Sequence, residues 1–383
     1  MKFSAFAAET IPYLLAAFMA AAVISFVLTP LVRRISLGLN AVDEPGMRRV
    51  NTVPVPRGGG VAVAIAFIVV GIALSNVNSS SLQQTPDVTN DPRRIVALLL
   101  GGALATVFGV LDDYFDLRAR WQFVGQLGLA AVAIGFGIVV VRLNNPVGPD
   151  FVLAQPFAVG FTVLWVVGMI NSLNFIDGLD GLSSGVAIIA ALTLGTISLS
   201  AGIAQPFIAA LCFALAGALV GFLRWNFQPA SVFIGTSGVM FVGYTLAVLS
   251  ILGVAKVAVA LLVLGVPIID AFWIIVRRLV QGRSPFTPDR GHLHHRLLDV
   301  GLSHRQTVVL IYAVCMVLGL LSLFLSGANQ LLAFVGIFVL IGLLLFLLAR
   351  VRVGRTGSVG GSGGVGGSGP DPDLKAAREG HSD

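Results

Sequence analysis

Long apolar segments alternate with short polar ones along almost the whole chain. Eleven of these segments are long enough to cross a bilayer, whose hydrocarbon core needs about 20 residues per helix. They lie at residues 11–32, 60–76, 95–111, 123–141, 157–175, 183–200, 206–223, 232–252, 256–276, 307–326 and 330–349. Each is too long and too uniformly apolar for a strand, so the pattern predicts an all-α polytopic membrane protein with about eleven transmembrane helices. Ten is the alternative, because the fifth and sixth segments lie close together.

The composition agrees with this pattern. Of the 383 residues, 24 are Lys or Arg and 18 are Asp or Glu, so that 11% are charged and 56% are hydrophobic. A soluble chain carries about 25% charged residues. The polar side chains are too few to cover a water-soluble surface, which excludes a soluble globular protein, a disordered chain and a disulfide scaffold. The two cysteines, Cys212 and Cys315, lie inside apolar segments and indicate no disulfide.

The basic residues predict the orientation in the membrane. Nineteen of the 24 fall in the loops after the odd-numbered segments or in the C-terminal tail. The positive-inside rule places these loops and the C terminus in the cytoplasm, and the N terminus outside. We expect a membrane domain over residues 1–353 and a Gly-rich disordered cytoplasmic tail over residues 354–383. The net charge of +6 then follows from topology, and we expect no nucleic-acid partner.

The first polar cluster on the predicted cytoplasmic side is acidic. Asp112 and Asp113 directly follow the third apolar segment. Two adjacent carboxylates at the end of an apolar helix repel each other, and a hard cation such as Mg²⁺ removes that penalty. The alternative is a solvated helix end paired with Arg118 and Arg120.

The second cluster is a ladder of polar residues at the end of the fifth segment. Its members recur every three residues and are Asn171, Asn174, Asp177 and Asp180. On a helix they form a slanted polar stripe, and Gly178 and Gly181 permit a break in the helix and the close approach of a bulky ligand. Such a ladder is costly in a membrane unless it binds something. The alternative is hydrogen bonding between helices.

The third and fourth clusters are basic. The loop at residues 277–305 holds four of the five histidines, among them His292, His294 and His295, together with Arg283 and Arg290. These side chains suit phosphate groups; a structural zinc site and a purely topogenic loop are the alternatives. Between residues 43 and 60 a loop rich in Pro and Arg ends in three glycines. It includes Arg57 and is suited to a phosphate or nucleotide, unless it is only a solvated loop.

These four clusters, in this order, resemble the polyprenyl-phosphate N-acetylhexosamine-1-phosphate transferases. That glycosyltransferase family includes the enzymes that start O-antigen and teichoic-acid synthesis, and phospho-MurNAc-pentapeptide translocase. Residues 171–182 and 284–297 carry the most specific part of the match, and the second of these is similar to the N-acetylglucosamine branch. The resemblance implies that a polyprenyl phosphate such as undecaprenyl phosphate attacks a UDP-sugar, for which UDP-GlcNAc is favoured, and releases UMP. It places this reaction at the cytoplasmic face of the bacterial plasma membrane. It also implies Mg²⁺, or Mn²⁺ in its place, and a homodimer.

The resemblance implies three groups of site residues. The acidic pair near the lipid phosphate, with one member as the base, is Asp112 and Asp113. The group around the metal and the nucleotide is Asn171, Asn174, Asp177 and Asp180. The histidines that face the diphosphate or the sugar are His292, His294 and His295. The metal ligands among these are Asn171 and Asp113, and the substrate-binding set also takes in Arg57, Arg283 and Arg290.

Three positions depart from the pattern of the family. Relatives usually carry an Asp magnesium ligand where this chain has Thr236, whose hydroxyl is a weak and neutral ligand. Gln122 stands where many relatives have Lys, and Asn51 where many have His. The resemblance therefore implies an altered metal site at the position of Thr236, for which Asp270 in the ninth segment is a candidate replacement ligand.

Two other functions remain open from the sequence. Residues 112–116 read DDxxD and residues 177–180 read DxxD, a pair of carboxylate sets that suits an intramembrane Mg²⁺-dependent prenyltransferase. That hypothesis leaves the histidines and both asparagines unexplained. A secondary transporter is the non-enzymatic alternative, but its charges should lie near the midplane, whereas here they gather at one side.

Overall fold

The computed structural model describes residues 7–43, 54–77, 82, 91–143, 151–200, 203–253, 260–261, 263–282 and 291–325, with isolated positions between 329 and 343. Backbone contacts divide the chain into one unit over Met1–Gly342 and a second over Leu343–Asp383. All helices and strands described below belong to the first unit. The predicted tail at residues 354–383 lies outside the described residues, as does most of the eleventh apolar segment, so the predicted domain boundary stays a prediction.

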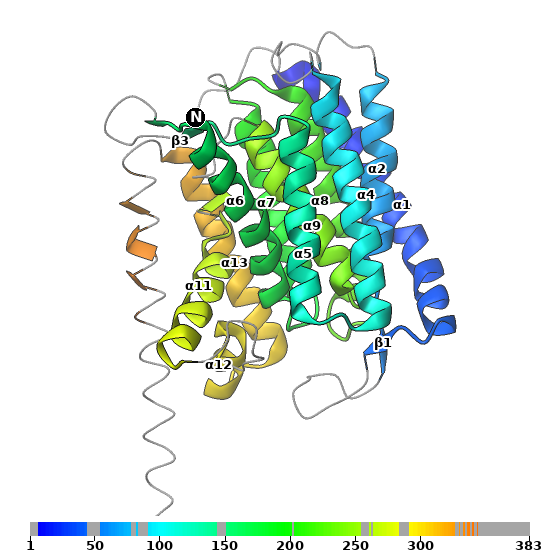
Figure 1. The fold of residues 1–383 in the computed structure, drawn as a ribbon. Helices are drawn as coiled ribbons and strands as arrows, with labels where there is room; N and C mark the ends of the chain where they lie inside the picture. The colour runs from blue at the N-terminus through cyan, green and yellow to red at the C-terminus, as the bar shows by residue number, and fades with distance from the viewer. Residues whose placement is uncertain are drawn as a thin grey trace, which may run out of the picture. The chain divides into compact units, whose positions relative to one another are not determined.

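The first unit is a bundle of helices (Figure 1). They are α1 (Ala7–Gly38), α2 (Gly60–Ser75), α4 (Pro92–Phe115), α5 (Ala119–Gly135), α6 (Gln155–Ile176), α7 (Leu182–Ser198), α8 (Pro206–Asn226), α9 (Gly235–Leu252), α11 (Gly265–Val280), α12 (Leu293–Val300) and α13 (His304–Phe324). Each of the first ten predicted segments overlaps one of these helices. Six of them, α1, α4, α6, α8, α9 and α13, are long and apolar enough to cross a membrane. The prediction of a helical, multi-pass membrane protein is thereby confirmed, with six helices that are long and apolar enough to span a bilayer.

Predicted and observed boundaries differ in places. The fourth segment was expected to run to residue 141, but α5 ends at Gly135, because Gly137 takes a positive φ of 82° that turns the chain away. In the ninth segment, residues 260, 261 and 263 are helical and α11 begins at Gly265; residues 254–259 lie outside the described residues, so the start at residue 256 stays a prediction. The short helix α12 was not among the predicted segments, because it has only eight residues and half of them are polar.

Two very short ladders accompany the helices. β1 (Val42–Asp43) pairs antiparallel with β2 (Val55–Pro56), with Val42 opposite Pro56. β3 (Arg142–Leu143) pairs antiparallel with β4 (Phe151–Val152), with Arg142 opposite Val152. Figure 1 shows β1 and α12 at one end of the bundle and β3 at the other. Two-residue strands leave no alternating pattern in the sequence, which is why none was predicted.

Glycines let several helices approach backbone to backbone. A methyl group added at Gly217 on α8 would lie 2.1 Å from the carbonyl oxygen of Phe18 on α1, and one at Gly221 would lie 2.1 Å from that of Ala22. This is the small-xxx-small spacing that brings membrane helices together. In the same way, Gly109 of α4 lies against the backbone of α9. The close packing brings the end of α4 to the start of α9.

The polar clusters meet at one end of the bundle. The helices α4, α6 and α11 end there, and α5, α7, α9 and α13 begin there, because successive helices run in opposite directions. Hydrogen bonds cross this end: Arg33 Nε donates to the carbonyl oxygen of Ser231 at 3.0 Å, and the backbone N–H of Gly59 donates to that of Phe233 at 2.9 Å. Residues far apart in the sequence therefore form one polar layer.

The contact between α1 and α8 predicts the effect of a single methyl group. We expect Gly217→Ala to destabilise the protein by about 1–3 kcal/mol, because the added carbon meets backbone that cannot move aside alone. Thermal unfolding of the purified protein in detergent measures the change. Gly128→Ala on α5 is the matched control, since no atom lies within 4 Å of the added carbon. An equal loss in both variants would contradict the packing argument.

Candidate active site

Asp113 joins α4 to the start of α9. Its Oδ1 accepts a hydrogen bond from the backbone N–H of Thr236 at 2.7 Å, and its Oδ2 accepts one from that of Ser237 at 3.0 Å. Gly235 has a positive φ of 71°, and a side-chain carbon there would lie 2.5 Å from Asp113 Oδ2. The first N–H groups of a helix lack partners within the helix, and a carboxylate is well suited to satisfy them. The predicted pair Asp113 and Thr236 is therefore brought together.

Asp112 is held by α5. The side chain of Asp112 is buried, and its Oδ1 accepts a hydrogen bond from Gln122 Nε2 at 2.9 Å. Gln122 is one of the positions at which the chain departs from the family pattern. The neutral side-chain amide of Gln122 thus donates directly to the carboxylate that is predicted to be catalytic.

Arg57 adds positive charge beside this acidic pair. Its guanidinium donates to Asp43 Oδ1, from Nε at 2.8 Å and also from its second terminal nitrogen, and lies 3.9 Å from Asp116. Burial lowers the pKa of Arg57, but the hydrogen bond to Asp43 and the charges of Asp43, Asp113 and Asp116 outweigh it and raise the pKa above its usual value. Arg57 therefore remains cationic near Asp113, as a phosphate-binding residue requires.

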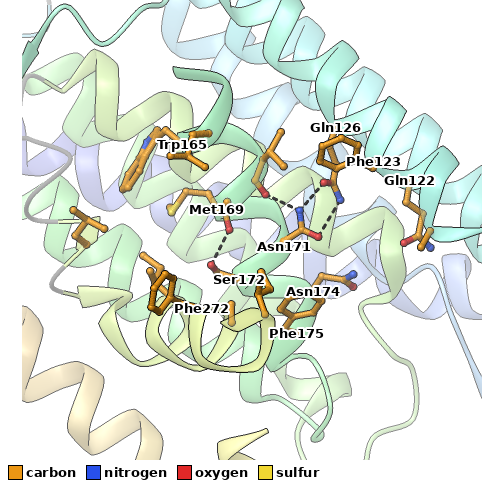
Figure 2. Close-up of a pocket in the computed structure, with 18 of the residues that line it drawn as sticks. Gln122, Phe123, Gln126, Trp165, Met169, Asn171, Ser172, Asn174, Phe175 and Phe272 are labelled. Atoms are coloured by element: carbon orange, nitrogen blue, oxygen red, sulfur yellow. Dashed lines mark hydrogen bonds between the residues drawn. The ribbon is translucent and has the colours of Figure 1, made fainter. Parts of the chain in front are cut away.

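Asn171 forms an amide pair with Gln126 on the facing helix. Asn171 Nδ2 donates to Gln126 Oε1 at 2.6 Å and to the carbonyl oxygen of Val167 at 2.8 Å. Figure 2 shows this pair in the wall of a cavity, with Asn174 and Phe175 further along the same helix. These two hydrogen bonds fix the orientation of the Asn171 side-chain amide. Gln126 was not among the predicted site residues.

Asp177 and Asp180 lie in the turn between α6 and α7. The hydroxyl of Ser183 donates to Asp177 Oδ1, and the backbone N–H of Ala230 donates to Asp180 Oδ2 at 3.0 Å. Burial, together with the charges of Asp113, Asp180 and Asp43, raises the pKa of Asp177 to about 7 in spite of the hydrogen bond from Ser183. The turn is therefore a cluster of acidic side chains.

The histidines gather at the start of α12. His292 Nδ1 lies 2.9 Å from Asp270 Oδ2, and the rings of His294 and His295 have centroids 4.3 Å apart. Burial, and then the neighbouring histidines, lower the pKa of His294 well below its usual value, so that it is neutral. Asp270, suggested above as a replacement metal ligand, instead binds His292 and the backbone N–H of Leu293 at 2.8 Å.

A cavity of about 790 Å³ opens beside these residues between α5, α6 and α11. Large apolar side chains line most of it, among them Phe123, Trp165 and Phe272 (Figure 2). Polar residues line the remainder: Gln122, Gln126, Asn171, Ser172, Asn174, Arg278 and His292. The cavity is therefore an apolar groove with a polar end.

Arg278, like Gln126, lines this groove and was not among the residues predicted from the sequence. It is 5% exposed, in the last turn of α11, and it lines the groove together with His292. The sequence analysis counted it only as a topogenic charge. Its position on the same helical face as the apolar residues of α11 could have revealed it. The predicted residues Arg283 and Arg290, and also Asn51, lie outside the described residues.

Comparison with known proteins decides the family. The family model for glycosyl transferase family 4 matches residues 95–254. A probable undecaprenyl-phosphate N-acetylglucosaminyl 1-phosphate transferase of Bacillus subtilis is 34% identical over 336 residues, which cover 85% of this chain and 88% of the relative. The chain belongs to glycosyl transferase family 4. The resemblance drawn from the four polar clusters is thereby confirmed.

Other relatives in this family have similar names. A decaprenyl-phosphate N-acetylglucosaminephosphotransferase of Mycolicibacterium smegmatis is 32% identical, over 88% of this chain and 89% of the relative. An undecaprenyl-phosphate alpha-N-acetylglucosaminyl 1-phosphate transferase of Escherichia coli is 29% identical, over 73% of this chain and 75% of the relative. The similarity thus covers most of the helical bundle and its polar end.

The donor atoms at the polar end of this family 4 chain suit a hard cation. Asp113, Asp177 and Asp180 offer oxygen, which Mg²⁺ prefers, and the raised pKa of Asp177 shows that the cluster would gain from positive charge. Within the described ranges, no three His, Cys, Asp or Glu side chains converge on one point that could hold a metal. A cation here would therefore also take ligands from amide, hydroxyl or substrate oxygens.

The raised pKa of Asp177 predicts how stability depends on pH. Between its ordinary value of 3.8 and about 7, the folded chain holds a proton that the unfolded chain releases. Without divalent cations, stability should therefore fall as the pH rises through this window. We expect Asp177→Asn to remove this fall, on the order of 1–3 kcal/mol. Thermal unfolding of both proteins between about pH 5 and about pH 8 measures the difference.

Asp91→Asn is the control for this experiment, because Asp91 caps the opposite end of α4. Its unfolding curve should depend on pH as the curve of the unchanged protein does. If Asp177→Asn left the pH dependence unchanged, burial of this carboxyl would not be the cause.

Proposed function

We propose that the protein transfers N-acetylglucosamine-1-phosphate from UDP-GlcNAc to a polyprenyl phosphate such as undecaprenyl phosphate. The products are polyprenyl-diphosphate-GlcNAc and UMP, and the reaction starts the synthesis of a cell-envelope polysaccharide. The observation that carries the proposal is the junction of an apolar groove with a layer of acidic, amide, arginine and histidine side chains. The names of the family 4 relatives support the same acceptor and the same sugar.

The groove suits the lipid acceptor. Its outer wall includes Leu164 and Phe272, which are 68% and 53% exposed and so can face lipid. An isoprenoid chain can enter sideways from the bilayer, since burying its apolar surface there replaces contact with lipid tails. Its phosphate would then lie at the polar end, near Gln122, Asn174 and Arg278.

The reaction is a phosphoryl transfer. An oxygen of the lipid phosphate attacks the phosphorus that carries the sugar, and the bond from that phosphorus to the oxygen of UMP breaks. Such reactions depend on positioning and on neutralising negative charge more than on covalent chemistry. Arg57 supplies positive charge and the histidines at the start of α12 supply hydrogen-bond donors, while Asp112 orients or deprotonates the lipid phosphate.

The acidic residues would hold the cofactor. We assign Asp113 and Asp177 as its carboxylate ligands, with Asn171 and the hydroxyl of Thr236 as the neutral candidates predicted from the sequence. Mg²⁺, or Mn²⁺ in its place, would neutralise the diphosphate and polarise its oxygens. Asp180 binds the backbone of Ala230 and so keeps the turn at residues 177–181 in place beside the other ligands.

The setting follows from the charge pattern. We propose about eleven spans in the bacterial plasma membrane, with the N terminus outside and the polar end in the cytoplasm, where UDP-sugars are made. The polar end contains Arg33, Arg57, Arg118, Arg224 and Arg278, which is the asymmetry that the positive-inside rule describes. A homodimer is proposed from the family resemblance alone.

The arrangement gives the two other hypotheses less support. In the DDxxD stretch, Asp113 binds the start of α9, whereas the side chain of Asp116 is 96% exposed. These carboxylates do not point to one diphosphate, as a prenyltransferase needs. The polar residues also gather at one end of the described bundle, whereas a transporter needs a path open to both sides.

Single substitutions at the polar end should abolish transfer. We expect Asp112→Ala, Asn171→Ala, Asp180→Ala and His292→Ala to lower UMP release by about 100-fold or more. Asp113→Asn is the better change at that position, because the amide oxygen can still accept a bond from α9. The assay follows UMP released from a panel of UDP-sugars with undecaprenyl phosphate, with and without Mg²⁺. Asp91→Ala, at the opposite end of α4, is the control.

Normal UMP release by the Asp113→Asn and Asp180→Ala proteins would refute this site. Transfer from another UDP-sugar in preference to UDP-GlcNAc would change the donor but keep the reaction. Release of inorganic diphosphate from a prenyl diphosphate would favour the prenyltransferase instead.

Thr236 predicts a specific response to Mg²⁺. Since its backbone N–H binds Asp113, the carboxylate added by Thr236→Asp would lie close to the Asp113 carboxylate. We expect this variant to unfold at a lower temperature without Mg²⁺, because like charges repel, and to reach half-maximal activity at a lower Mg²⁺ concentration. Thr236→Asn matches its size without the charge. If Mg²⁺ dependence were the same in all three proteins, the metal would lie elsewhere.

A further inference from the structure

Asp270 is a buried carboxylate on a largely apolar helix. It lies in α11, it is 3% exposed, and its neighbours Ile269 and Ala271 are buried as well. A carboxylate in such surroundings is costly unless both of its oxygens are hydrogen-bonded. The catalytic groups assigned above do not include it. Its presence therefore calls for a role of its own.

Both oxygens of Asp270 bind the start of α12. Oδ2 lies 2.9 Å from His292 Nδ1, and Oδ1 accepts the backbone N–H of Leu293 at 2.8 Å. His292 is the residue that precedes the helix, with φ −61° and ψ 149°, and its own side chain makes no capping bond. Asp270 thus caps α12 from another helix and holds the histidine ring with the same carboxylate.

The contact decides which ring nitrogen is free for a ligand. A carboxylate accepts hydrogen bonds, so Nδ1 must carry a proton, and Nε2 is the nitrogen left for other partners. His292 also lines the groove, and its ring lies between Phe175, with centroids 5.6 Å apart, and His294, also 5.6 Å away and nearly parallel. The ring is therefore fixed in direction by Asp270 and in position by its two neighbours.

We propose that Asp270 is a positioning residue that orients His292, so that Nε2 binds an anionic oxygen of the diphosphate being transferred. This inference rests on the proposed function. When an anionic oxygen lies at Nε2, the ring can donate to it from Nε2 and to Asp270 from Nδ1 at the same time. The carboxylate of Asp270 then supports a positively charged donor at the place where negative charge spreads during phosphoryl transfer.

Asp270→Asn tests this role with little change in size. Its amide oxygen can still cap Leu293, but its NH₂ group then faces Nδ1 and opposes the protonated ring. We expect kcat for UMP release to fall by about 10- to 100-fold, while KM for UDP-GlcNAc changes by less than about threefold. In a His292→Ala background the same substitution should change kcat little, because Asp270 acts through that ring. An equal fall in both backgrounds would overturn the proposal.

Leu293→Pro separates the helix cap from the histidine contact. It removes the N–H that Asp270 accepts, proline is favoured at the first helical position, and the dihedral angles of His292 already suit a residue before proline. Leu293→Ala controls for the lost side chain. We expect both to have similar activity, within about threefold of each other. A loss in the proline variant, together with unchanged kcat in Asp270→Asn, which keeps the cap, would mean that Asp270 acts only as a cap.

The pair can also be observed without turnover. In the full-length protein labelled with ¹⁵N-histidine, a hydrogen-bonded Nδ1 proton of His292 should give a downfield resonance that both Asp270→Asn and His292→Ala remove. If the resonance is present but the unchanged protein releases no UMP, the proposed function fails and the pair stands. If UMP is released but Asp270→Asn leaves both the resonance and kcat unchanged, the proposal about Asp270 fails. If His292→Ala is too slow for steady-state assay, the same double-mutant comparison is made on single-turnover rates of UMP release at high enzyme concentration.

Discussion

The bond between the Asp113 carboxylate and the start of α9 is the constraint on which the polar end depends. The N–H groups of Thr236 and Ser237 lie in a largely apolar bundle, where a backbone donor without a partner is costly. Asp113 satisfies both, and this is possible because Gly109 lets α4 and α9 touch and Gly235 leaves room for the carboxylate. The same carboxylate therefore joins the two helices and belongs to the candidate cation site.

The same device recurs around the site. Asp270 satisfies the first N–H of α12, and Asp180 satisfies the N–H of Ala230 in the segment before α9. In each case a carboxylate from one element holds the backbone of another, and its remaining lone pairs stay available for a cation, a histidine or a substrate. The few acidic residues of the chain thus hold the polar end together and supply its chemistry. Arg57, which stays cationic through Asp43, offsets part of their charge.

The groove explains why this layer lies at the end of a membrane bundle. A lipid phosphate and a nucleotide sugar differ in solubility, and they can meet only where an apolar wall adjoins a polar one. The groove between α5, α6 and α11 has such a boundary, at the level of Gln122, Asn174 and His292. The amide pair of Gln126 and Asn171 lies on it and is fixed by hydrogen bonds rather than by charge. At the boundary between water and lipid, burying a neutral amide costs less free energy than burying an ion.

The sequence by itself determined the helices and the residues from which the polar end is built. Apolar length alone predicted ten of the described helices, because a bilayer admits few other structures, and four polar clusters indicated the family. Only the tertiary structure decided what these residues contact. Asp113 meets Thr236 across 123 positions of sequence and Asp270 meets His292 across 22, so no local spacing records either contact. For the same reason Gln126 was missed and the contact of Asp270 with His292 was not predicted, whereas Arg278 was missed although its helical face gave a local signal. Long-range contacts follow from how glycine-lined helices pack, and that packing is a property of the whole bundle.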